Sequence, residues 1–71
     1  MLEFDGSKLK KLRKERQLTQ KELGILVGKG SSYIANYENG YAAPPSDTLL
    51  SLLAFFKVSP RDMSKTEEAA R

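Results

Sequence analysis

Apolar residues recur along this 71-residue chain at spacings of three and four, which is the periodicity of amphipathic helices. The pattern predicts five short helices, at residues 8–17, 20–27, 31–39 and 48–57 and in a short segment that begins at Pro60. The chain is long enough for one small domain. We therefore expect an all-α fold.

Residue types at the predicted helix ends fit their expected roles. Ser7 is suited to cap the first helix, and Ser46 or Asp47 the fourth. Thr19 and Glu22 have the spacing of a capping box at the start of the second helix.

The stretch 20–39 reads as two helices joined by the tight turn 28–30. Gly28 suits the left-handed position that ends a helix, and Gly30 is acceptable as the next N-cap. Two helices joined by a short glycine-containing turn form a helix-turn-helix arrangement. The second helix of such a pair can lie in the major groove of DNA.

A hydrophobic core is expected from the inward-facing apolar positions. Its predicted members are Leu9, Leu12, Leu23, Ile34, Leu50, Leu53 and Phe56. Leu26 and Val27 extend the apolar face of the second helix, with Gly24 as a small residue on its inner side. Tyr37 and Met63 should pack against the core. Leu2 and Phe4 are available to pack at its edge.

The composition restricts the classes of function. The formal net charge is +3, and residues 1–36 hold eight of the twelve basic side chains. A one-sided positive surface attracts polyanions, although lysines on a helix can also form a merely solvated face. The chain lacks cysteine and histidine, and its acidic residues are scattered over separate helices. We therefore expect no enzyme, cofactor or metal.

No apolar run approaches the roughly 20 residues of a membrane span. The N-terminus also lacks the order of a secretory signal. The expected location is the cytoplasm, with no membrane partner.

Several short motifs occur together in a characteristic order. They are LTQKELG at 18–24, VG at 27–28, SYI at 32–34, YENG at 37–40, Pro44, TLL at 48–50 and VS at 58–59. This order resembles the Cro/phage-repressor class of helix-turn-helix proteins, the XRE family. The resemblance implies a five-helix, lambda-repressor-like domain at 7–63. Residues 1–6 are expected to be a lead-in, and the polar stretch 64–71, which lacks apolar anchors, a flexible tail. The resemblance also implies sequence-specific binding of double-stranded DNA by a small prokaryotic or phage transcriptional regulator, a repressor or autoregulator, with no small-molecule ligand.

The resemblance assigns roles to particular residues. The positions that match base contacts are Ser31, Ser32, Ala35 and Asn36. Candidate phosphate contacts are Gln20, Lys21, Lys29, Tyr33, Asn39 and Tyr41. Arg13 and Glu38 match a structural ion pair of the family. Two alternatives stay open: Tyr33 could serve packing alone, and Arg13 could contact phosphate.

The chain departs from the family pattern at three positions. Lys29 stands where the family has an apolar residue, and Gly30 where it has a capping Ser or Thr. Lys57 replaces a usual glycine, so a left-handed backbone there would be strained. The short side chains of the reading helix imply close docking, water-mediated contacts or reliance on DNA shape.

Family members often dimerise through the C-terminal region. Candidate interface residues are Leu49, Leu52, Phe55 and Pro60. We expect a homodimer on a pseudo-palindromic operator. The alternative is an antitoxin or partner-binding module that contacts a small protein through the fourth helix or the tail.

Overall fold

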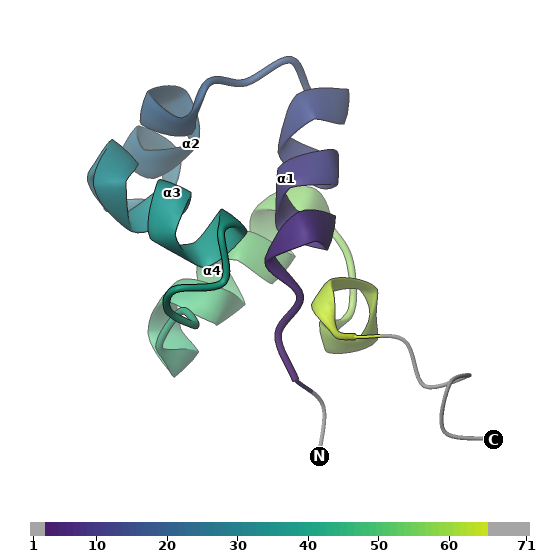
Figure 1. Ribbon diagram of the computed structural model, residues 1–71. Coiled ribbons are helices and arrows are strands. Elements are labelled where there is room, and N and C mark those ends of the chain that lie inside the picture. The colour runs from purple at the N-terminus through teal and green to yellow at the C-terminus, as the bar shows by residue number, and fades with distance from the viewer. Residues whose placement is uncertain (1–2, 66–71) are drawn as a thin grey trace, which may run out of the picture.

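The computed structural model describes residues 3–65 of the chain (Figure 1). This part contains the α-helices α1 (Gly6–Glu15), α2 (Gln20–Val27), α3 (Ser31–Glu38) and α4 (Ser46–Phe56), followed by the 3₁₀-helix η1 (Pro60–Met63). The all-α class is confirmed, but the prediction of five α-helices is wrong. The last segment makes a single 3₁₀ turn that begins with a capping box of Ser59 and Asp62, and it ends there because the backbone is already extended at Ser64.

Two predicted helix starts differ from those observed. The α1 helix begins at Gly6, with Asp5 as its N-cap, because the Asp5 carboxylate accepts hydrogen bonds from the backbone N–H and the hydroxyl of Ser7. The α4 helix begins at Ser46, and Pro45 occupies the N-cap with an extended backbone. The lead-in therefore ends before Asp5. Ser7 lies within the first turn of α1.

The segments before α1 and after η1 lie side by side. The backbone N–H of Asp5 donates to the carbonyl of Met63 at 2.8 Å, and that of Lys65 donates to the carbonyl of Glu3 at 2.8 Å. Phe4 and Ser64 form an isolated antiparallel bridge between these two bonds. Ser64 is buried, so it does not belong to a free tail. Leu2 and residues 66–71 lie outside the described part.

The core forms where the four helices and η1 meet. Its buried apolar members are Leu9, Leu23, Ile34, Tyr37, Leu52, Leu53, Phe56 and Met63. Leu50 and Leu26, which were predicted to face inward, are 65% and 54% exposed. The α4 helix turns Leu52, Leu53 and Phe56 inward, while Leu50 is exposed to solvent. No helix of residues 3–65 combines the length and apolar character needed to cross a membrane.

Left-handed backbone occurs at several chain reversals. Gly28 ends α2 with φ of 75°, as predicted, and Gly40 follows α3 with φ of 81°. Lys57, the C-cap of α4, has φ of 58°, so the strain expected at that position is present. Gln17 has the same φ of 58° after α1, which sequence reasoning did not anticipate.

Candidate nucleic-acid interface

Helices α2 and α3 are held together by a close approach at Gly24. The carbonyl of Gly24 accepts a hydrogen bond from the backbone N–H of Lys29 at 2.7 Å. A Cβ atom at Gly24 would lie 2.3 Å from the carbonyl oxygen of Lys29. The turn can fold back against α2 only because this position has no side chain. This contact sets the position from which α3 begins.

The α3 helix presents one face to the core and another to solvent. Ile34, Tyr37 and Glu38 are buried. On the other side lie the four residues predicted to contact bases: Ser31, Ser32 and Asn36 are exposed, and Ala35 is half-buried. The structure therefore brings the whole predicted reading surface onto one accessible face.

The residues predicted to contact phosphate lie at the start of α2, in the turn before α3, in the first turn of α3 and after its end. Lys21, Tyr33, Asn39 and Tyr41 are exposed, while Gln20 and Lys29 are half-buried. The Lys29 ammonium lies 5.4 Å from the centroid of the Tyr33 ring, a cation–π distance. Tyr33 is 54% exposed, so it is not enclosed by core packing. At the end of α3, the carbonyl of Asn36 accepts from the backbone N–H of Tyr41 at 2.9 Å, which folds the chain back.

Gln20 has an internal partner in addition to its predicted outward role. Its side-chain amide nitrogen donates to Oε1 of Glu38 at 3.1 Å. Thr19 and Glu22 form the predicted capping box around the same helix start, with bonds of 3.0 and 2.8 Å. The first turn of α2 is therefore fixed both to itself and to the end of α3.

The predicted ion pair between Arg13 and Glu38 is present. Nε of Arg13 lies 2.6 Å from Oε2 of Glu38, and Nη2 lies 3.1 Å from Oε1. Nη1 of Arg13 donates to the carbonyl of Leu18 at 2.6 Å. Each residue is 7% exposed. These internal bonds and this burial favour the structural role of Arg13 over a phosphate contact.

The predicted dimer residues do not form one exposed surface. Leu52 is completely buried, so its assignment to an interface is wrong: it faces the core from the inner side of α4. Phe55 is half-buried and packs edge-on against Phe56 with ring centroids 4.9 Å apart. Leu49 and Pro60 line a shallow hollow of about 240 Å³ that also includes Phe4.

Two tertiary contacts of α1 and its C-cap were not predicted from the sequence. A Cβ atom at Gly6 would lie 2.1 Å from the carbonyl oxygen of Tyr37, so α1 can approach the end of α3 only through a glycine. The guanidinium of Arg16 lies 5.4 Å from the ring centroids of both Phe55 and Phe56. Gly6 itself, a glycine just before a predicted helix, was the sequence feature that could have indicated the close approach of α1 to α3. No local pattern indicated the second.

Comparison with known proteins gives consistent matches. The sequence model of a family described as helix-turn-helix matches residues 9–63. The HTH-type transcriptional regulator ImmR of Bacillus subtilis strain 168 is 33% identical over 66 residues, which are 93% of this chain and 52% of ImmR. The chain thus spans about half the length of this curated relative.

Two solved structures match over most of this chain and most of their own length. The P22 c2 repressor in complex with synthetic operator 9T has a TM-score of 0.81 and 27% identity, covering 87% of this chain and 94% of the repressor chain. The restriction-modification controller protein C.AhdI from Aeromonas hydrophila has a TM-score of 0.73 and 29% identity, covering 82% and 88% of the two chains. The chain belongs to the helix-turn-helix family, and the resemblance identified from its motifs is confirmed.

Proposed function

We propose that this chain is a sequence-specific, double-stranded DNA-binding module of a transcriptional regulator, with α3 in the major groove. The observation that carries the proposal is the exposed, neutral face of α3 that contains Ser31, Ser32 and Asn36. The named relatives support it, since they include a repressor in complex with its operator, a transcriptional regulator and a controller protein. The proposed activity is binding without catalysis.

Base reading is assigned to four short side chains. The Asn36 amide can make a paired hydrogen bond to adenine, and the hydroxyls of Ser31 and Ser32 can serve several bases. The methyl group of Ala35 fits an apolar contact with thymine. Because these side chains are short, the backbone of α3 must approach the base edges closely or bind them through water.

Affinity is assigned to the residues around α3. Lys21 and Lys29 supply positive charge, while Tyr33, Asn39 and Tyr41 supply hydrogen-bond donors. Gln20 is proposed to donate one amide hydrogen to Glu38, as observed, and to direct the other to a phosphate. Such contacts fix the register of the protein on the duplex and give binding its dependence on salt.

We further propose that two copies bind a pseudo-palindromic operator as a homodimer. Leu49 and Pro60, which line the hollow beside Phe4, are the proposed contacts, and Phe55 contributes only at its exposed edge. Two α3 helices related by a two-fold axis would meet half-sites about one helical turn apart.

Selection from a pool of randomised duplexes, followed by sedimentation of protein with the selected duplex, tests both proposals. The expected result is enrichment of one symmetric site and a complex that contains two protein chains. Absence of any enriched sequence would contradict the reading function. An enriched but asymmetric site, bound by one chain at every protein concentration, would overturn the dimer alone.

A further inference from the structure

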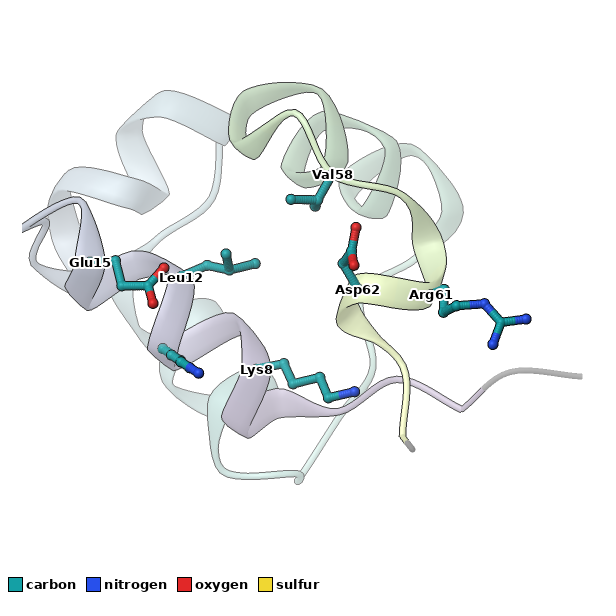
Figure 2. A pocket seen from close by; sticks show the side chains of 7 residues that line it. Lys8, Leu12, Glu15, Val58, Arg61 and Asp62 are labelled. Carbon is teal, nitrogen blue, oxygen red and sulfur yellow. The ribbon is translucent and has the colours of Figure 1, made fainter. Parts of the chain in front are cut away.

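A groove of about 540 Å³ lies between α1 and η1. Figure 1 shows α1 between α3 and η1, so the groove lies away from the reading face. Figure 2 shows Leu12 of α1 and Val58, which precedes η1, pointing into the groove. Its floor is therefore apolar, and the proposed DNA contacts leave it uncovered.

Positive charge is concentrated on α1, the helix that forms one wall of this groove. The only charged side chain of α3 is the buried Glu38, whereas α1 carries five basic residues and the single acid Glu15. Arg13 is paired internally, so four lysines remain: Lys8, Lys10, Lys11 and Lys14. Their excess of three charges over Glu15 equals the formal net charge of the whole chain.

The charged residues that line the groove differ in their partners and in where they point. The Asp62 carboxylate accepts hydrogen bonds from the backbone N–H and the hydroxyl of Ser59 at 2.9 and 3.1 Å, so it is engaged in capping the start of η1. The Lys8 ammonium donates to the carbonyl of Ser64. Arg61 extends outward from η1, and Glu15 lies at the opposite end of the groove (Figure 2). Lys11 is an exposed lysine that lines the groove, and within residues 3–65 its ammonium makes no hydrogen bond or ion pair.

We propose that the groove between α1 and η1 docks an acidic, amphipathic segment of a partner protein. An aliphatic side chain of that segment covers Leu12 and Val58, and its carboxylates face Lys8 and Lys11, the two lysines of α1 that line the groove. Charge complementarity selects this occupant. A second copy presenting the same surface would bring two lysine-rich helices together, which is unfavourable.

The apolar floor distinguishes a protein segment from nucleic acid. Leu12 and Val58 offer a phosphate group no hydrogen-bond donor, whereas an aliphatic side chain can pack against them. An amphipathic peptide matches both features, because it can bury an apolar side chain while it places its acids beside the lysines. The inference does not rest on the proposed DNA-binding function.

The test uses a fluorescein-labelled synthetic helical peptide with leucines on one face and glutamates on the other, measured by fluorescence anisotropy. Lys11→Glu is compared with Lys10→Glu, which makes the same charge change on α1 at a position that does not line the groove. The expected loss of affinity is about tenfold for Lys11→Glu and about threefold or less for Lys10→Glu. Circular dichroism verifies that both variants are folded.

Two further probes separate docking from general charge attraction. A control peptide with serine in place of leucine should bind about tenfold more weakly, because it cannot bury the apolar floor. An unrelated duplex DNA should not displace the leucine peptide. Failure of the leucine peptide to bind, equal losses for the two lysine variants, equal binding of the serine peptide, or displacement by the duplex would each overturn the inference.

Discussion

The carboxylate of Glu38 is held at two points by the guanidinium of Arg13, with Nε–Oε2 and Nη2–Oε1 distances of 2.6 and 3.1 Å. This buried pair joins the body of α1 to the last residue of α3. Gln20 donates to the same carboxylate from the start of α2. The orientation of the proposed reading helix thus depends on polar contacts with both preceding helices, as well as on the apolar core.

Removing one member of this pair should destabilise the fold more than replacing both. Glu38→Ala leaves a buried guanidinium without its partner, at a cost of about 3–5 kcal/mol. The double variant Arg13→Met with Glu38→Leu fills the space with apolar groups. Its free energy of unfolding should therefore fall less than that of Glu38→Ala. Urea unfolding measures both free energies. A double variant that is less stable than Glu38→Ala would contradict this account of the pair.

Gly24 should tolerate no side chain. Gly24→Ala places a methyl group against the carbonyl of Lys29 and should cost about 1–3 kcal/mol in the free energy of unfolding. Gly30→Ser is the matched control: the nearest atom to its Cβ is 3.9 Å away, and a serine hydroxyl can cap α3. The control should be neutral or stabilising by a few tenths of a kcal/mol. Equal losses at the two positions would refute the steric argument.

Within residues 3–65, two residues other than glycine have a left-handed backbone, and replacement by glycine should relieve the strain at each. Gln17→Gly and Lys57→Gly should each stabilise the protein by about 0.5–1 kcal/mol, because both residues have φ of 58°. Lys57→Ala removes the same side chain without gaining conformational freedom, so it should give no increase. Thermal unfolding distinguishes the variants, and a gain from alanine equal to that from glycine would show that side-chain contacts are responsible.

Asp5 should make stability depend on pH in the acid range. The hydrogen bond from the Ser7 side chain lowers the pKa of Asp5 below its ordinary value, with smaller contributions from backbone bonds and Lys8. The unfolded chain therefore binds this proton more readily than the folded one. The contribution of ionised Asp5 to the free energy of unfolding is complete above about pH 4, and it disappears as the pH falls through the lowered pKa.

Asp5→Asn keeps a capping oxygen but removes this titration. The difference in unfolding free energy between the wild-type protein and the variant should therefore shrink as the pH falls below about 4. Urea unfolding at a series of pH values measures it. A difference that stays constant over the acid range would exclude a role for Asp5 ionisation.

The helix order follows from local sequence and the proposed reading face from the family resemblance, but the detailed packing follows from neither. Periodicity and the glycine turn located α2 and α3, and the spacing of Thr19 and Glu22 fixed the start of α2. The depth of burial along α4 could not be derived in the same way, because nearly every side of that helix is apolar. Only the tertiary arrangement determines that Leu52 is enclosed and Leu50 is exposed.

Some contacts of the site also depend on tertiary proximity. The bond from Gln20 to Glu38 joins residues 18 positions apart, and no local pattern encodes it. The family resemblance supplied the Arg13–Glu38 pair, which charge counting alone would have left among many possible pairs. The backbone pairing of residues beside Phe4 and Ser64 likewise became visible only in the fold.

Asn36→Ala provides the most direct test of the claim that α3 reads DNA sequence. Its affinity should be measured for the selected duplex and for single-base variants of it, with Lys21→Ala as the phosphate-contact control. The account predicts that Asn36→Ala costs about 1–3 kcal/mol on the selected site and removes discrimination at one base pair. Lys21→Ala should weaken all duplexes alike and reduce the salt slope by about 1. A uniform loss across all sequences for Asn36→Ala would contradict the assignment of the reading face.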